Sequence, residues 1–388
     1  MKKYLEKIQE VGTPVYIYDR EIIRTQYYKL KNSLPEDFNI LYAVKANPNK
    51  EVIGFLQSLG AGADIASSGE LKRVLDCHYP SELITFAGPG KTEDEIRLAI
   101  QASCAAINVE SIDELNIIEE CAESLSKRAN ICVRINPLQS SQRGGLHMGG
   151  GVTQFGIAEE DLSDFFSHLE KCKNINFQGI HVFVGSQILD EKVLLENFTT
   201  CFDLALRMQT EFKKEISLIN FGGGFGIPYF PHEKELDLVQ FKKELEEIAD
   251  HYRDFFPAAR FFVESGRFLV GLSGFYITKV LYKKKSRGTK FVIIDGGMHH
   301  NIAASGQLGS SLKRNYDLRI LNKLDEPLME KVTIAGSLCT PMDVLARNID
   351  VPFIERGDYV CILNSGAYGY SLSPLFFLSH TLPKEILI

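Results

Sequence analysis

Residues 38–48 read Phe38-Asn39-Ile40-Leu41-Tyr42-Ala43-Val44-Lys45-Ala46-Asn47-Pro48, an apolar run that ends in a lysine. Continuous apolar character of this kind is typical of a strand buried on both faces of a parallel sheet. Similar runs, rich in Val, Ile and Phe, follow at residues 60–66, 83–89, 105–109, 129–136, 177–185, 218–224 and 260–266. The sequence therefore contains eight candidate strands for one parallel sheet.

Amphipathic helical segments separate many of these runs, at residues 91–102, 111–127, 159–172, 192–212 and 236–256. Two helix starts resemble capping boxes: Thr92-Glu93-Asp94-Glu95 and Ser111-Ile112-Asp113-Glu114. Strands that alternate with helices in this way predict an α/β fold, a (β/α)8 TIM-like barrel. A doubly wound sheet is the competing interpretation, and the count of eight strands favours the barrel.

The pattern changes after about residue 268. Segments 275–284, 289–295, 331–338 and 359–365 read as strands with few helices between them, which predicts an all-β domain. One more strand candidate, residues 14–19, precedes the barrel and could pair with this C-terminal sheet. We therefore expect a barrel over residues 25–268, and a β-sandwich or β-barrel domain built from residues 1–24 with 269–388.

Composition narrows the class of protein. The chain has 388 residues and a formal net charge of -7, which argues against nucleic acid or an anionic membrane as the main partner. Its eight cysteines form no CxxC pair, so we expect no zinc or other metal site. The charged start of the chain lacks an apolar signal core, and no stretch reaches the ~20 apolar residues of a membrane span. These features favour a cytoplasmic enzyme.

In a barrel, active sites lie at the carboxyl ends of the strands. Lys45 at the end of the first run would point into the barrel mouth, where partial desolvation makes an amine nucleophilic toward an aldehyde. The alternative is a lysine that reaches the surface, which is the commoner case for a single lysine.

Two further strand ends carry candidate ligands. Consecutive glycines at 222–224 leave backbone N–H groups free to surround an anion, although such a run is often only a turn. Glu264 and Arg267 close the last strand, where they could face one ligand or simply form a local ion pair. An amine, a phosphate cradle and an acid together fit pyridoxal phosphate better than a sugar or a nucleotide.

These residues also resemble a known family. Tyr42-Ala43-Val44-Lys45-Ala46-Asn47, Gly222-Gly223-Gly224-Phe225-Gly226, Glu264-Ser265-Gly266-Arg267, Gly366-Ala367-Tyr368-Gly369 and the separate Cys339 are similar to motifs of the alanine racemase-like, fold-type III enzymes. Within that group the chain resembles the pyridoxal-phosphate decarboxylases, which include diaminopimelate and ornithine decarboxylases. The likeness runs from about residue 13 to residue 388.

The resemblance implies a role for each matching residue. Lys45 would be the Schiff-base lysine, and either Cys339 of a neighbouring subunit or Lys45 itself would protonate Cα. The further cofactor-binding positions that it implies are Asp64, Glu70, Phe183, Ser186, Gly223, Gly224, Glu264, Gly266, Arg267 and Tyr368. Substrate contacts would come from Cys339, Thr340, Asp343 and His299. The same resemblance implies an obligate homodimer in which the β domain completes the partner's active site.

Three departures from the family pattern bear on the substrate. Phe183 stands where a histidine usually stacks on the cofactor ring, while His181, two residues earlier, reads as structural. Thr340 replaces a glutamate, and residues 295–301 lack an arginine, both of which bind the distal end of diaminopimelate. Losing two such anchors would cost roughly 1–3 kcal/mol per unpaired group.

Two blocks that depart from the family pattern are Gly296-Gly297-Met298-His299-His300 and Leu338-Cys339-Thr340-Pro341. They resemble a subgroup that serves natural-product and siderophore pathways, typified by the butirosin-pathway decarboxylase of a carrier-bound glutamyl group. We therefore expect decarboxylation of an amino acid or amino-acid derivative, held either free or on a carrier protein. The alternatives are a diaminopimelate decarboxylase of lysine biosynthesis, an amino-acid racemase and a non-catalytic carrier of pyridoxal phosphate.

Overall fold

The computed structural model describes residues 2–138, 146–147, 151–306 and 314–388 of the chain. It forms two compact units: residues 24–228 with 234–269, and residues 1–23 with 229–233 and 270–388. Within the described residues, no helix is both long and apolar enough to cross a bilayer.

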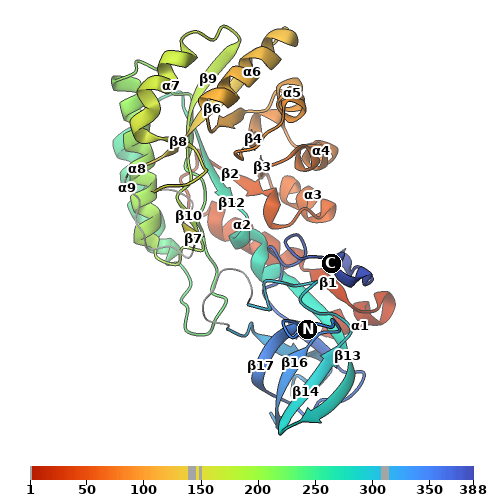
Figure 1. The fold of residues 1–388 in the computed structure, drawn as a ribbon. Coiled ribbons are helices and arrows are strands. Elements are labelled where there is room, and N and C mark those ends of the chain that lie inside the picture. Colours follow the sequence, from red (N-terminus) through yellow and green to blue (C-terminus); the bar gives the residue numbers. More distant parts are fainter. Residues whose placement is uncertain (1, 139–145, 148–150, 307–313) are drawn as a thin grey trace. The chain divides into compact units, whose positions relative to one another are not determined.

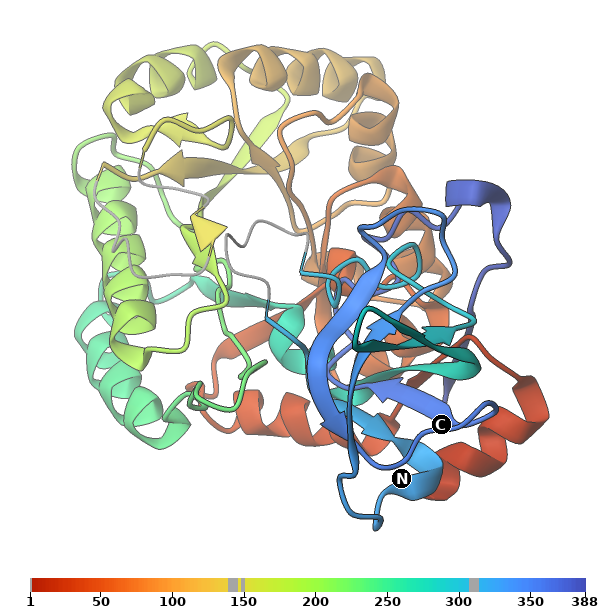
Figure 2. The same ribbon diagram turned by 60° about the horizontal axis from the view of Figure 1, so that its bottom comes forward.

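The larger unit is a closed parallel barrel (Figure 1, Figure 2). Its hydrogen-bonded order is β5-β4-β3-β2-β12-β11-β9-β6, and a further pairing of β5 with β6 closes the ring. The eight strands are β2 (Phe38–Ala43), β3 (Gly62–Ile65), β4 (Ile84–Phe86), β5 (Ala106–Val109), β6 (Ala129–Asn136), β9 (Ile175–Val182), β11 (Leu218–Asn220) and β12 (Arg260–Ser265). Each coincides with one of the eight apolar runs, so the predicted (β/α)8 barrel is confirmed.

Helices lie outside this ring of strands (Figure 2). They are α3 (Lys50–Ser58), α4 (Ser68–Asp76), α5 (Glu93–Gln101), α6 (Ile112–Ser124), α7 (Leu162–Leu169), α8 (Glu191–Thr210) and α9 (Leu238–Arg253), with α2 (Arg20–Lys31) before the first barrel strand. The expected capping box of α5 is present, since Thr92 and Glu95 bond reciprocally. That of α6 is only half formed: Ser111 accepts from Glu114 N, but the Glu114 carboxylate accepts from Glu110 N instead.

The smaller unit is a mixed β domain. Its sheet runs β15-β18-β13-β14-β16-β17, and β1 joins β13 antiparallel and β19 parallel. The strands are β1 (Val15–Tyr18), β13 (Gly274–Ser286), β14 (Thr289–Ile294), β15 (Leu318–Ile320), β16 (Glu330–Ala335), β17 (Val344–Val351), β18 (Tyr359–Ile362) and β19 (Lys384–Leu387). The predicted pairing of the N-terminal strand with the C-terminal sheet is confirmed, and α1 (Lys2–Val11) packs Tyr4 and Ile8 into the same apolar core.

Three strands of this domain have no counterpart in the sequence analysis: β15, β17 and β19. In β17 the apolar alternation is broken by Arg347 and Asp350, and Asn348 adopts a left-handed φ of 52° beside a register shift against β16. Such a bulge displaces the side-chain alternation from which strands are recognised. Six expected strands end at least three residues before the predicted run does: β2 at Ala43, β4 at Phe86, β9 at Val182, β11 at Asn220, β16 at Ala335 and β18 at Ile362.

Candidate active site

The inward-facing residues of the barrel strands change from apolar to polar between one layer and the next, two residues further along the chain. Neighbouring strands contribute Leu41, Leu83, Ala106, Cys132, Leu218 and Phe262 to one apolar cluster. Because side chains alternate along a strand, the residue two positions further on faces the same way. Two positions beyond these residues lie Thr85, Asn108, Arg134, Asn220 and Glu264, which are polar and buried. Asp64 on β3 and His181 on β9, the register partners of Ala43 and Asn220, are polar and buried as well. We call these seven residues the polar layer; the eighth strand has Ala43 there.

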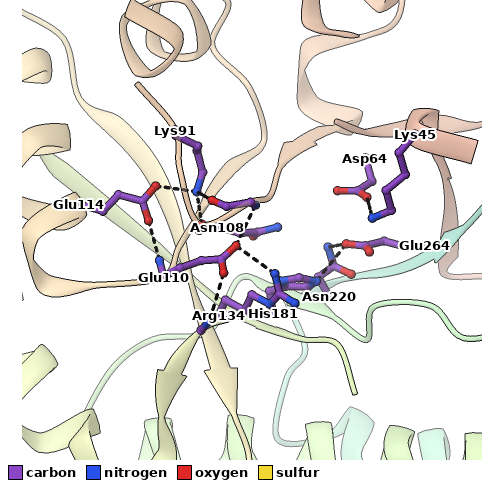
Figure 3. A network of polar contacts seen from close by, with 12 residues as sticks. Lys45, Asp64, Lys91, Asn108, Glu110, Glu114, Arg134, His181, Asn220 and Glu264 are labelled. Atoms are coloured by element: carbon purple, nitrogen blue, oxygen red, sulfur yellow. Dashed lines mark hydrogen bonds and ion pairs between the residues drawn. The ribbon is translucent and has the colours of Figure 1, made fainter. Parts of the chain in front are cut away.

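Lys45 reaches this layer from a turn rather than from a strand. It lies in a short 3-10 helix, η1 (Val44–Ala46), which is closed by a 3.0 Å hydrogen bond from Asn47 N to Val44 O. Its Nζ donates to Asp64 Oδ2 at 3.2 Å (Figure 3). The Asp64 side chain is 1% exposed whereas that of Lys45 is 39% exposed, so the amine remains open to a ligand. This places the predicted lysine beside one of its two predicted acids.

Asp64 is kept close to its protonated form. Burial, reinforced by the charge of Glu264, raises the pKa of Asp64 to about 7, against the lowering effect of Lys45. The second predicted acid, Glu70, accepts a hydrogen bond from Ala66 N at 2.7 Å, and burial raises its pKa as well. A carboxyl group with a pKa near neutrality can accept or give up a proton at physiological pH.

Glu264 lies in the opposite environment, although it is equally buried. Its Oε1 accepts from Asn220 Nδ2 at 2.9 Å and lies 3.1 Å from His181 Nε2 (Figure 3). Burial alone would raise the pKa of Glu264, but His181, Lys45 and Asn220 together lower it to about 2. The site therefore holds one carboxyl group that is poised to change its proton and one that stays ionised, a separation typical of acid–base sites.

The glycine run forms a tight turn directly after β11. Gly222 has a left-handed φ of 62°, and a Cβ there would lie 2.3 Å from Val182 O. A Cβ at Gly223 would lie 2.6 Å from Glu264 O, and one at Gly224 would lie 2.9 Å from Ile188 Cδ1. Only glycine fits this path, and no described residue accepts a hydrogen bond from the N–H of Gly223 or Gly224. Backbone donors at such a turn suit a phosphate group.

The other predicted phosphate ligands of the barrel unit also follow strand ends. Ser186 is half-buried on β10 (Gly185–Ser186), just beyond β9. Gly266 follows β12, and a Cβ on it would lie 2.8 Å from Ala46 Cβ in the Lys45 turn. Arg267 begins α10 (Arg267–Val270). All three therefore belong to the carboxyl-end loops of the barrel, as the sequence predicts.

Phe183 connects the lysine with the glycine turn. Its ring centre is 5.5 Å from Lys45 Nζ and 6.0 Å from the Arg134 guanidinium. A Cβ on Gly222 would lie 2.9 Å from Phe183 Cδ2, so the ring covers this turn. A flat apolar ring in this position can stack on an aromatic cofactor without contributing a charge or a hydrogen bond.

Buried ion pairs fix the other side of the polar layer (Figure 3). Lys91 Nζ contacts Glu114 Oε1 at 2.6 Å and donates to Asn108 O at 2.9 Å. Arg134 Nη1 lies 3.0 Å from Glu110 Oε1. These residues were not predicted from the sequence, and neither were Thr85, Asn108 and Asn220. Thr85, Asn108, Arg134 and Asn220 could have been found from their spacing, because each lies two positions after an apolar residue of the barrel interior. Inspection of the strand ends alone misses these residues, because they lie before the ends of the predicted runs.

The remaining candidates lie in the β-domain unit. Cys339 is exposed in this unit and Thr340 is half-buried. Asp343 is buried, and its two oxygens accept from Met298 N at 2.7 Å and Leu338 N at 2.9 Å. This carboxylate therefore ties the loop that carries Cys339 to the loop that carries His299.

His299 and Tyr368 occupy strained or crowded positions. His299 is fully buried, with its ring 3.7 Å from that of His300 and 4.8 Å from that of His380. Burial and the neighbouring His380 lower the pKa of His299 to about 4. Tyr368 is held with a left-handed φ of 62°, in a turn where a Cβ on Gly366 would lie 1.8 Å from Val270 O. Non-glycine residues in this conformation are often functional.

The barrel, its lysine and its glycine turn define a class of protein. A primary amine beside an acid, an ionised carboxylate and free N–H donors at a turn fit the aldehyde, the ring nitrogen and the phosphate of pyridoxal phosphate. Together with the mixed β domain they define a fold-type III pyridoxal-phosphate enzyme. The chain belongs to the pyridoxal-dependent decarboxylases, because residues 20–271 match the pyridoxal-binding domain of that family.

Named relatives support this membership along nearly the whole chain. The L-glutamyl-[BtrI acyl-carrier protein] decarboxylase of Niallia circulans is 40% identical over 97% of this chain and 88% of its own length. The 2-[(L-alanin-3-ylcarbamoyl)methyl]-2-hydroxybutanedioate decarboxylase of Staphylococcus aureus is 31% identical over 98% of this chain and 96% of its own. Among solved structures, diaminopimelate decarboxylase of M. jannaschii with L-lysine matches with a TM-score of 0.91, 29% identity, and coverage of 99% and 89%.

Proposed function

We propose that this pyridoxal-phosphate decarboxylase removes the α-carboxylate from an aminoacyl group whose far end is joined to a carrier protein. One observation carries the choice of substrate. Thr340 follows Cys339 where a glutamate would hold the distal end of diaminopimelate, so a free distal amino-acid end loses an ionic anchor. The 40% identity to a decarboxylase of a carrier-bound glutamyl group supports the same choice.

The barrel residues would hold the cofactor in a fixed orientation. Lys45 would bind its aldehyde carbon, and Glu264 its ring nitrogen. Gly223, Gly224, Gly266, Arg267 and Ser186 would bind its phosphate, and Phe183 would cover one face of its ring. Tyr368 of the β domain would be a further phosphate ligand. Bound pyridoxal phosphate supplies an electron sink for the pair released when the Cα–carboxylate bond breaks.

The protein's own groups would manage the protons. Asp64 lies 3.2 Å from Lys45 Nζ and has a pKa near 7, so it can hold a proton while the amine is engaged and return it afterwards. Cys339 would place a proton on Cα, in a loop held by Asp343 and backed by the buried His299. Glu70 would steady the turn after β3 that follows Asp64.

We further propose that the active unit is a homodimer, in which one subunit contributes Lys45 and the other contributes Cys339, with Thr340 bordering the substrate. The resemblance to decarboxylases with shared sites motivates this arrangement.

Carbon dioxide release tests the substrate. We expect a glutamyl thioester of a carrier protein to be decarboxylated at least ~10-fold faster than free L-glutamate, because the tether supplies binding that the distal carboxylate cannot. Faster release from meso-diaminopimelate would overturn the proposal and favour the diaminopimelate alternative. Loss of optical activity without carbon dioxide would indicate a racemase, and no turnover of any substrate would indicate a cofactor carrier.

A further inference from the structure

His181 is a titratable member of the polar layer that lies beside Glu264, and the proposed mechanism leaves it without a role. It is 1% exposed and lies on β9, whereas Glu264 lies two strands away on β12. The strand between them, β11, supplies Asn220, which is the direct register partner of His181. Three adjacent strands therefore bring three polar side chains to one point inside the barrel.

Among the described residues, Asn220 and His181 both approach the same oxygen of the carboxylate. Asn220 Nδ2 donates to Glu264 Oε1 at 2.9 Å, and His181 Nε2 lies 3.1 Å from the same atom. Neither contact uses Oε2. A carboxylate held by one oxygen keeps its other oxygen for a ligand in a fixed direction.

The orientation of Asn220 is fixed by its other end. Its Oδ1 accepts a 2.9 Å hydrogen bond from Gly222 N, the first residue of the glycine turn. Since an amide has one acceptor and one donor end, this bond directs Nδ2 toward Glu264. Asn220 thus connects the turn proposed to bind phosphate with the carboxylate proposed to bind the ring nitrogen.

The charges around this point come from every neighbouring strand. Lys45 after β2 and Asp64 on β3 face Glu264, and both influence its ionisation or are influenced by it. Arg134 on β6 is the register partner of His181 and is itself paired with Glu110. Arg134 is thus already paired, whereas His181 Nε2 lies at an ion-pair distance of 3.1 Å from Glu264 Oε1, although the two groups lack the alignment of a hydrogen bond.

We propose that His181 is a positioning residue, which with Asn220 immobilises Glu264 Oε1 and so directs Oε2 at the ring nitrogen of the bound cofactor. This rests on the proposed role of Glu264. Removing the Nε2 contact would let the carboxylate rotate and would weaken recognition of the ring nitrogen alone. The phosphate and aldehyde contacts would be unaffected.

The experiment compares two variants whose substituted side chains carry the same amide group but differ in length. Gln at position 181 places its amide nitrogen near the position of histidine Nε2, whereas Asn places it near Nδ1, too far from Glu264. His181→Gln and His181→Asn both keep a buried polar amide, so a loss of folding should affect them alike. Circular dichroism and thermal unfolding of both variants check this.

The readout is binding, not turnover. Dissociation constants are measured by fluorescence titration of the cofactor-free protein with pyridoxal phosphate, and with its analogue in which CH replaces the ring nitrogen. We expect the wild type to prefer the natural cofactor by at least ~10-fold, the value of a charge-assisted hydrogen bond. His181→Gln should keep this preference, and His181→Asn should reduce it to within about twofold, with unchanged affinity for the analogue.

Each other outcome is decisive. If His181→Asn weakens both ligands equally, His181 only supports the fold and the inference is wrong. If His181→Asn lowers the preference in a Glu264→Gln background as much as in the wild type, the effect does not pass through Glu264. If the wild type binds both ligands equally well, the proposed role of Glu264 itself fails, and the inference fails with it.

Discussion

At the residue scale, the site depends on two buried carboxyl groups whose surroundings act in opposite directions. Burial and Glu264 raise the pKa of Asp64 to about 7, from 3.8 in an unfolded chain. The folded protein therefore binds a proton that the unfolded chain releases between pH ~4 and ~7, and Asp64 makes folding less favourable as the pH rises through this window. Lys45, 3.2 Å away, offsets only part of this cost.

Asp64→Asn should remove this pH dependence. We expect the free energy of unfolding of the cofactor-free variant, relative to the wild type, to increase between pH 5 and pH 8. Urea unfolding at several pH values measures it. Glu330→Gln is the matched control: Glu330 lies in the β-domain unit, and Lys283 and Lys290, acting against burial, lower its pKa to about 2 from 4.5, so its stabilising effect is lost only below pH ~4.5 and its difference should stay flat over this range. Parallel curves for the wild type and Asp64→Asn would contradict the assignment.

At the element scale, the glycine turn after β11 determines whether the phosphate cradle can form. Gly222→Ala would place a methyl group 2.3 Å from Val182 O at a φ of 62°. We expect a loss of about 1–3 kcal/mol in stability, together with weaker binding of pyridoxal phosphate. Gly90→Ala is the control, because a Cβ there meets nothing within 4 Å. Equal effects of the two substitutions on unfolding and on cofactor titration would contradict this account of the turn.

The buried pair of Lys91 and Glu114 ties β4, β5 and α6 together. The Lys91 side chain is 1% exposed, so Lys91→Met would leave the Glu114 carboxylate buried without its cation. We expect a loss of about 3–5 kcal/mol in unfolding free energy, measured with urea. The double variant Lys91→Met/Glu114→Gln should lose less than Lys91→Met alone, because no uncompensated charge remains. A double variant that is less stable than the single one would show that the pair does not act through its charge.

The elements show which parts of the site a sequence can predict. The eight apolar runs each became a barrel strand because burial on both faces leaves a continuous apolar signature. Lys45 and Glu264 were identified because they stand at strand ends, whereas Asp64 was identified only through the family resemblance. Asn220 and Asn108 were not, since a single polar residue inside a short apolar strand is recognised only when the neighbouring strands are aligned.

At the scale of the whole molecule, the candidate residues belong to two units that are each interleaved in sequence. Lys45 and Glu264 lie in the barrel unit, and Cys339 and Tyr368 in the β-domain unit. The pairing of β1 with the C-terminal sheet was predictable, because residues 14–19 form a single strand pattern that precedes the barrel and has no neighbouring strand in sequence. The strand β17 was not, because its bulge at Asn348 has no fixed sequence signature.

A mixture of two inactive variants tests the shared active site. Lys45→Ala and Cys339→Ala should each lack activity as homodimers, since each of their sites lacks one group. After subunit exchange, a random mixture should regain about a quarter of wild-type carbon dioxide release, because half of the dimers are mixed and each has one complete site. No recovery, with exchange confirmed by native mass spectrometry, would show that both groups act within one chain.

The proposed decarboxylase function depends most directly on the covalent attachment of pyridoxal phosphate to Lys45. Protein loaded with the cofactor is reduced with borohydride, digested and analysed by peptide mass spectrometry. We predict a single pyridoxyl group on the peptide that carries Lys45, and none in a Lys45→Ala variant treated in the same way. A pyridoxyl group on another lysine, or a loaded protein that yields no reduced adduct, would contradict it.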